Sequence, residues 1–101
     1  MTPNEYQKLA VRTIVDLGED AFLRHLENGV IGMSVESNEV LQHVQKRVFC
    51  GKTLDHVHLL DECGDVLWYI SYLLDTLGYT LEECMEHNVA KTEDRYSDRI
   101  K

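Results

Sequence analysis

Apolar residues recur every three or four positions along most of the chain, which is the spacing of amphipathic helices. The first such segment has clear start signals: Thr2 can cap a helix, Pro3 suits its first position, and Glu5 completes a capping box. Its apolar pattern continues to Leu17, and Gly18 interrupts it. The pattern therefore predicts an amphipathic helix that ends near Leu17.

Residues 19–28 are less regular, and they could form a short helix for which Asn28-Gly29 is either the end or a turn. A second long helix is predicted over about residues 30–47. Its apolar stripe consists of Met33, Ser37, Val40, Val44 and Val48. Residues 49–52 are predicted to be a connection.

The third helix is predicted to begin at a cap, either Thr53 or Asp55, and to extend to about Leu77, where Gly78 ends it. Its stripe is similar to the seam of a coiled coil. The residues of this stripe are Leu59, Cys63, Val66, Ile70, Leu73 and Leu77.

A second capping box, Thr80 with Glu83, begins a fourth helix that extends to about Arg95. Residues 97–101 are predicted to be a frayed tail. No segment has the alternating pattern of a strand. The predicted fold is therefore all-α, a small antiparallel helical bundle of four or so helices.

Composition narrows the possible functions. The chain has 101 residues, the size of a single domain, and 44% of them are hydrophobic. The formal net charge of −8 disfavours direct binding to nucleic acid, because the phosphates would be repelled. An acidic protein can still bind phosphorylated small molecules where a divalent metal reverses the local charge. No apolar run is long enough to span a membrane, and no signal peptide is visible.

The three cysteines, Cys50, Cys63 and Cys84, have no Cys-x-x-Cys spacing. Because Cys63 lies in the apolar stripe of the third helix, it is predicted to be a buried free thiol. An odd number of cysteines without a disulfide pattern is typical of a reducing compartment. The cytoplasm is therefore the expected location.

Two pairs of acidic residues share one spacing: Glu36 with Glu39, and Glu62 with Asp65. Residues three apart on a helix project about 60° from each other, so each pair shares a face. Both pairs border an apolar stripe, so the four side chains can converge between two packed helices. Four carboxylates would repel one another unless a cation lay among them, and such oxygen ligands suit Mg²⁺, with Mn²⁺ as a possible substitute.

Three alternatives compete with a magnesium site at these residues. For any single acidic pair, a solvated helix face is the commonest role. A di-iron site would need Glu-x-x-His on two helices, and the chain contains no such motif. Zinc is disfavoured because His56 and His58, two residues apart, point to different sides of a helix. His25, His43 and His87 are scattered and are expected at the surface or at a partly buried rim.

Further residues surround the acidic pairs, which are separated by 22 residues. They are Gly32-Met33, Lys46, Gly51-Lys52, Gly64-Asp65-Val66-Leu67-Trp68-Tyr69, Asn88-Val89-Ala90-Lys91 and Arg95-Tyr96. In this order, over about residues 28–96, the chain resembles the MazG-type all-α nucleoside triphosphate pyrophosphohydrolases. A weaker similarity is present at Tyr6-Gln7. Asn38 and Thr92 depart from the family, which often has glycine and leucine there, and these departures concern pocket shape and substrate range.

The resemblance implies a reaction, the Mg²⁺-dependent hydrolysis of a ribo- or deoxynucleoside triphosphate to the monophosphate and pyrophosphate. The metal-binding and catalytic residues would be Glu36, Glu39, Glu62 and Asp65. The metal would lower the pKa of an attacking water, and one of the four acids would accept its proton. The candidate substrate-binding residues are Lys46, Tyr69, Asn88, Lys91 and Arg95. Trp68 could stack on the base or pack in the core.

The resemblance also implies one MazG-like domain over residues 1–101 and a homo-oligomer, a dimer or tetramer, with sites near the subunit contacts. Two alternatives stay open. The chain could be a non-catalytic helical interaction or regulatory module with a solvated or degenerate acidic face. The same fold could instead act on another phosphoanhydride, such as an alarmone or a phosphoribosyl-nucleotide.

Overall fold

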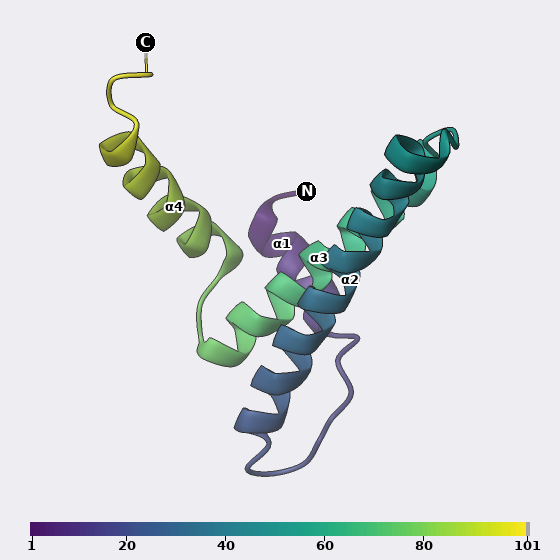
Figure 1. Cartoon of the computed structure of the whole chain (residues 1–101). Helices are drawn as coiled ribbons and strands as arrows, with labels where there is room; N and C mark the ends of the chain where they lie inside the picture. The colour runs from purple at the N-terminus through teal and green to yellow at the C-terminus, as the bar shows by residue number, and fades with distance from the viewer. Residues whose placement is uncertain (101) are drawn as a thin grey trace.

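The computed structural model describes residues 1–100, which form four α-helices and, within that range, no strand (Figure 1). The helices are α1 (Pro3–Val11), α2 (Phe22–Cys50), α3 (His56–Leu77) and α4 (Leu81–Arg95). The all-α prediction is therefore confirmed. None of the helices in the described range is both long and apolar enough to cross a membrane.

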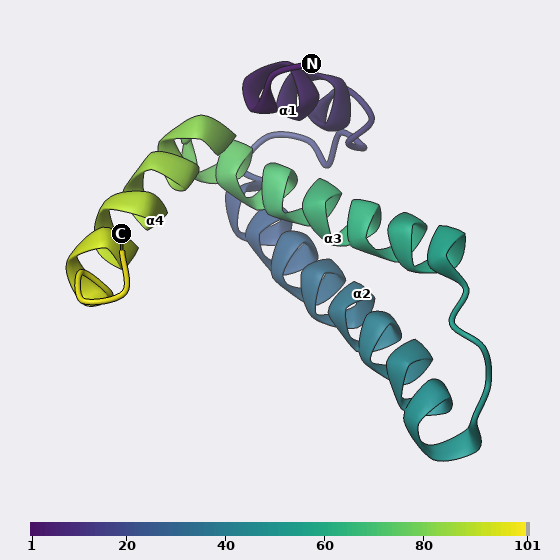
Figure 2. The ribbon, with the colours of Figure 1, turned by 90° about the horizontal axis from the view of Figure 1, so that it is seen from above.

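Helices α2 and α3 pack side by side in antiparallel directions and form the main body of the molecule (Figures 1 and 2). The 29-residue α2 continues through Gly29, where the sequence allowed a helix end or a turn. A Cβ atom on Gly29 would lie 3.2 Å from Cδ1 of Tyr72, and one on Gly32 would lie 2.1 Å from Cε1 of Tyr69. These glycines allow α2 to pack closely against α3 and do not end the helix. The two separate segments expected over residues 19–28 and 30–47 are therefore one helix.

Helix α1 is shorter than predicted, because it ends at Val11 and residues 12–21 form a loop to α2. Thr13 holds the chain just beyond the helix. Its hydroxyl donates to the carbonyl of Ala10 at 2.7 Å and accepts the indole N–H of Trp68 at 2.9 Å. This contact with α3 takes the place of the further helical turns that the apolar pattern predicted.

The predicted signals are confirmed at the starts of α1, α3 and α4 and at the end of α3, whereas α2 continues to Cys50, into the predicted connection over residues 49–52. The capping residues are Thr2 with Glu5 for α1, Asp55 for α3, and Thr80 with Glu83 for α4. Gly78 ends α3 in the left-handed conformation, with a φ of 85°. In the segment predicted to fray, the N–H of Arg99 donates to the carbonyl of Tyr96 at 2.9 Å within a turn, and Lys101 lies outside the described residues.

Gln7 ties α1 to the junction between α3 and α4. Its buried side chain accepts the N–H of Leu81 at 2.8 Å and donates to the carbonyls of Ser71 and Tyr79 at 3.3 and 3.1 Å. Beyond this junction α4 extends away from the α2–α3 pair (Figure 1). The first residues of α4 are therefore held against α1, whereas most of the remaining helix is exposed to solvent.

The apolar core of the single chain is small. The buried apolar residues in the described range are Ala10, Ala21, Tyr72 and Leu81. Many large apolar side chains are exposed, and Phe49 reaches 79%. The radius of gyration is 16.4 Å, compared with about 13 Å for a compact domain of this length. Cys63 is exposed, so the prediction of a buried thiol is wrong: within residues 1–100, nothing covers that part of the α3 stripe.

Candidate functional site

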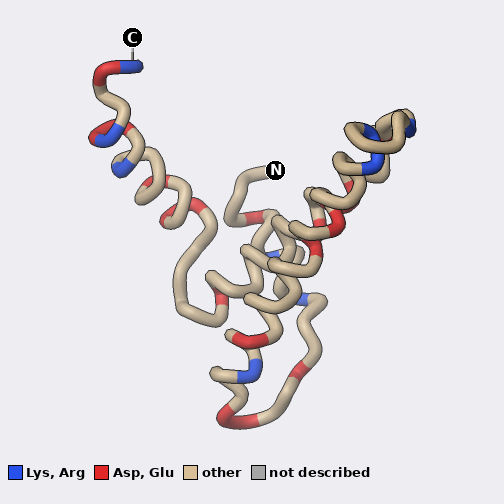
Figure 3. The backbone as a smooth tube through the Cα atoms, in the orientation of Figure 1, with Lys and Arg blue, Asp and Glu red and all other residues tan. Residues whose placement is uncertain are grey.

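The four acidic residues that the sequence suggests lie on the facing sides of α2 and α3. In Figure 3 the acidic segments of the two helices lie next to each other partway along the pair. The negative charges of Glu39, Asp65 and Glu62 all act on Glu36. The structure thus brings the four carboxylates together, and their role as metal ligands stays a prediction.

Two oxygens of this acidic cluster are buried without a hydrogen-bond partner in the described chain, Oε2 of Glu36 and Oε2 of Glu62. Glu62 is only 6% exposed, and its other oxygen, Oε1, lies 2.8 Å from Nε2 of His58. Burying a charged oxygen without a partner costs about several kcal/mol, which is similar to the cost of losing a hydrogen bond to a charged group. A cation between the helices would provide the missing partner.

The electrostatics of the site agree with this geometry. The pKa of Glu36 is raised, chiefly by burial, then by the negative charge of Glu39 and then by that of Asp65. Tyr6 of α1 lies close enough to respond as well, because its pKa is raised by burial and then by the charge of Asp65. Three helices therefore surround a partly buried region of negative potential, which favours a divalent cation.

A pocket of about 390 Å³ adjoins Glu36, between α2, α3 and the loop that follows α1. Its wall includes Gly32, Trp68 and Tyr69, and the rings of the last two meet edge to face at 4.9 Å. A pocket of this size with aromatic walls can hold a planar ligand. Tyr69, predicted to contact substrate, thus lies in a pocket that also reaches the acidic cluster.

Further along α2, a second pocket of about 270 Å³ also borders the acids. It is lined by Glu39, Gln42, His43, Lys46, His58 and Glu62. Lys46 is exposed at this pocket, so its ammonium is available to an anionic group of a ligand. Of the basic residues that the sequence suggests, Lys46 is the one that the fold brings to the acids.

The other predicted substrate-binding residues, Asn88, Lys91 and Arg95, are exposed on α4. Because α4 extends away from the α2–α3 pair, the fold of one chain does not bring them to the acidic cluster (Figures 1 and 3). Arg95 instead lies over the ring of Tyr96, with its guanidinium carbon 5.8 Å from the ring centroid.

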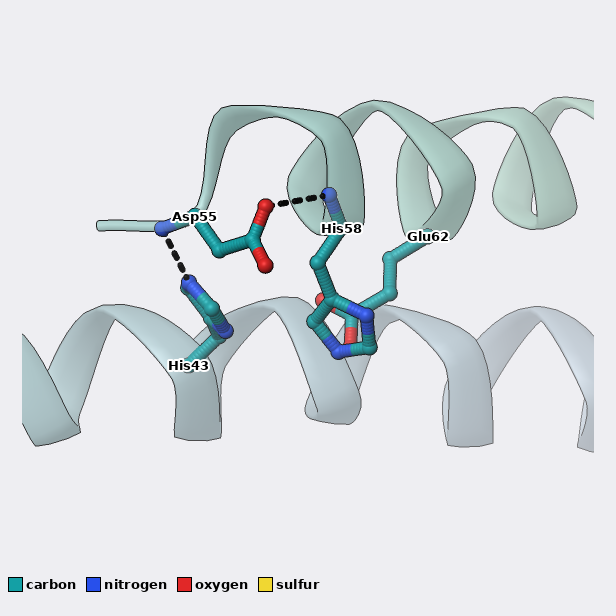
Figure 4. Close-up of polar contacts among 4 residues, drawn as sticks. All are labelled: His43, Asp55, His58 and Glu62. Atoms are coloured by element: carbon teal, nitrogen blue, oxygen red, sulfur yellow. Dashed lines mark hydrogen bonds and ion pairs between the residues drawn. The ribbon is translucent and has the colours of Figure 1, made fainter. Parts of the chain in front are cut away.

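The structure adds two residues that the sequence reasoning did not connect, His43 of α2 and His58 of α3. Their ring centroids are 5.1 Å apart, and Figure 4 shows the ring of His58 beside Glu62 and the ring of His43 nearer to Asp55. The sequence held a signal for them, since each histidine lies four residues from an acid of its own helix, namely Glu39 and Glu62. The sequence therefore predicted scattered histidines, whereas in the structure His43 lies close to His58.

These observations define an all-α protein with an acidic site between two helices and, beside it, a pocket whose wall includes aromatic side chains. The family model of the MazG nucleotide pyrophosphohydrolase domain matches residues 27–100. The chain therefore belongs to the MazG nucleotide pyrophosphohydrolase family, as its motifs indicated. Searches of curated proteins and of solved structures gave no significant match.

Proposed function

We propose that this chain is a Mg²⁺-dependent nucleoside triphosphate pyrophosphohydrolase, which converts a ribo- or deoxynucleoside triphosphate to its monophosphate and pyrophosphate. The observation that carries the proposal is the pair of buried, unpartnered oxygens on Glu36 and Glu62. They lie among four converging carboxylates, next to a pocket that can take a base. Membership of the MazG family supports the same reaction class.

The residues present fit the proposed metal. Glu36, Glu39, Glu62 and Asp65 offer only carboxylate oxygens, the ligands that Mg²⁺ prefers and that Mn²⁺ also accepts. When bound, the ion would neutralise phosphate charge and lower the pKa of an attacking water. Rigid positions in the middle of two helices suit a site that must hold a triphosphate in one orientation.

The chain's own groups would perform the remaining tasks. The aromatic pocket would hold the base against Trp68 and Tyr69, and the phosphates would then extend toward Glu36, which lines the same pocket. Lys46 would contact phosphate oxygens from the second pocket. One of the four acids would accept the proton of the attacking water as the bond to the α-phosphate forms and pyrophosphate leaves.

A homo-oligomer, a dimer or tetramer, is part of the proposal. The exposed apolar side chains of α2 and α3 and the small core leave a large surface that a second copy would bury favourably. In such an assembly Asn88, Lys91 and Arg95 would approach the acids of a neighbouring copy. The three exposed free cysteines fit a reducing cytoplasm, which is the proposed location.

The decisive experiment is an assay with Mg²⁺ on a panel of ribo- and deoxynucleoside triphosphates that resolves pyrophosphate from orthophosphate. Glu62→Gln removes a charge of the cluster, and Asp61→Asn is its matched control, because Asp61 is the exposed neighbour on the same helix. We expect monophosphate and pyrophosphate from the wild type and the control, and background rates from Glu62→Gln.

Two results would contradict the proposal. One is the absence of turnover on every triphosphate by a folded chain that binds Mg²⁺. The other is the release of orthophosphate in place of pyrophosphate, which would mean attack at a different phosphorus atom.

A further inference from the structure

A histidine lies one helical turn beyond the acidic pair on each of the two central helices. His43 follows Glu39 by four residues on α2, and His58 precedes Glu62 by four residues on α3. Because α2 and α3 are antiparallel, these two turns face each other (Figure 4). The acidic cluster is thus continued, along the same seam, by two nitrogen donors.

The donor atoms of this set are close enough to share one ion. A nitrogen of His43, a nitrogen of His58 and a carboxylate oxygen of Glu62 all lie within 4.8 Å of one another. Two ligands of a tetrahedral metal lie about 3.4 Å apart when each bond is about 2.1 Å long. The side chain of His58 is 54% exposed, so its ring can rotate by the small amount that coordination requires.

We propose that His43, His58 and Glu62 form a binding site for a divalent transition metal, for which Zn²⁺ is the best match. Two imidazole nitrogens and one carboxylate oxygen, with water in the fourth position, are a ligand set that Zn²⁺ uses. Mg²⁺ prefers oxygen ligands, so it would favour the acidic cluster. The two neighbouring sites would therefore select different cations.

The environment of Glu62 is a further observation. It is 6% exposed, its Oε1 pairs with His58, and its Oε2 has no partner in the described chain. A buried carboxylate oxygen without a partner is unfavourable, and a bound cation would remove this cost. With one oxygen engaged by His58 and the other free, this carboxylate can bind one cation through each oxygen.

Hydrogen bonds hold the donors in place in the metal-free chain. Nε2 of His58 donates to Oε1 of Glu62, and the backbone N–H of Asp55 donates to Nε2 of His43 at 3.2 Å. A metal would replace the proton between His58 and Glu62. Coordination through Nδ1 of His43 would require the ring proton to move to Nε2, and the exposed N–H of Asp55 would then donate to water in place of His43. Lys46 is exposed, so its ammonium can stay in solvent while a cation binds.

The test is Zn²⁺ binding to the untagged full chain without nucleotide, measured by calorimetry on metal-free protein. The variants are His43→Gln and His58→Gln, and the matched control is His56→Gln, an exposed histidine on the same turn of α3 as His58. Loss of an outer-shell partner weakens metal binding about 10–100-fold, so loss of a direct ligand should weaken Zn²⁺ binding by about tenfold or more. The control should bind Zn²⁺ like the wild type.

A second measurement needs no variant. Zn²⁺ added to the wild type should shift the side-chain nitrogen resonances of His43 and His58, and those of His56 and His87 should not move. The inference is overturned if the variants and the control bind Zn²⁺ equally, or if Zn²⁺ shifts other histidines instead. A chain that binds Zn²⁺ as expected but hydrolyses no nucleotide would refute the proposed function alone.

Discussion

Replacement of Gly32 by alanine should destabilise the α2–α3 pair and displace Tyr69. A Cβ atom on residue 32 would lie 2.1, 2.3 and 2.4 Å from three ring carbons of Tyr69. Carbon atoms pack at about 3.5–4.0 Å, so the ring would have to move by more than about 1 Å. Overpacking of this kind lowers the free energy of unfolding by about 1–3 kcal/mol, and the higher helix propensity of alanine offsets about 1 kcal/mol of it. The expected net loss is up to about 2 kcal/mol.

Gly64→Ala is the matched control for this change. Gly64 also lies inside a helix, but apart from its own stretch of α3 no atom lies within 4 Å of the position that its Cβ would take. Here alanine should raise the free energy of unfolding by up to about 1 kcal/mol, which corresponds to about 4–8 °C in Tm for a domain of this size. Both variants are compared with the wild type by urea denaturation in EDTA at one protein concentration, because self-association would shift the midpoints.

A double mutant isolates the contact between the helices. Once Tyr69 is replaced by alanine, Gly32→Ala should become stabilising by up to about 1 kcal/mol, because the ring it would meet is gone. If Gly32→Ala alone stabilised the wild type as much as Gly64→Ala does, the close approach of α2 and α3 at Gly32 would be refuted.

Three further variants test the site and its support. The pKa of Glu36 is raised in the folded chain, so the folded state holds this proton more tightly than the unfolded state. The free energy of unfolding without metal should therefore fall as pH rises from the unfolded-state pKa of Glu36 to its folded-state pKa. Glu36→Gln should flatten this pH dependence in EDTA, and an unchanged dependence would contradict the raised pKa. Gln7→Leu should lower the free energy of unfolding by about 1–3 kcal/mol, because it removes the acceptor of the Leu81 amide, and unchanged hydrogen exchange at Leu81 would count against this role. Glu62→Gln should abolish the rise in Tm on addition of Mg²⁺ while Asp61→Asn retains it, and an equal rise in both would exclude Glu62 as a ligand.

The starts of α1, α3 and α4 were predictable because their causes are local. The capping boxes at Thr2 and Thr80 and the cap at Asp55 depend on side chains within three residues of the helix start. The convergence of the acids was also accessible, since each pair borders the apolar stripe that packs α2 against α3. The MazG motifs added the family, which composition and spacing alone did not establish.

Most of the features that sequence reasoning missed have causes on another helix. In the sequence Gly29 resembles a helix end, but in the structure it allows α2 to pack closely against Tyr72 of α3. Helix α1 ends earlier than predicted because Thr13 accepts a hydrogen bond from Trp68 of α3. The pairing of His43 with His58 depends on the register of two antiparallel helices, which a single helical pattern does not encode. Cys63 lies in an apolar stripe, but no other part of the described chain covers it.

Because α2 is uninterrupted, it fixes the distance between the groups that it carries. Gly32, at the wall of the aromatic pocket, and Glu36, in the acidic cluster, are one turn apart on this helix, about 6 Å along its axis, and no break separates them. A ligand that reaches both must therefore match a length set by backbone geometry. The loop after α1 supplies the adjustable part of the same pocket, through Thr13, Val15 and Leu17. The choice among ligands of different width should consequently follow the sequence of this loop, while the helices fix the length.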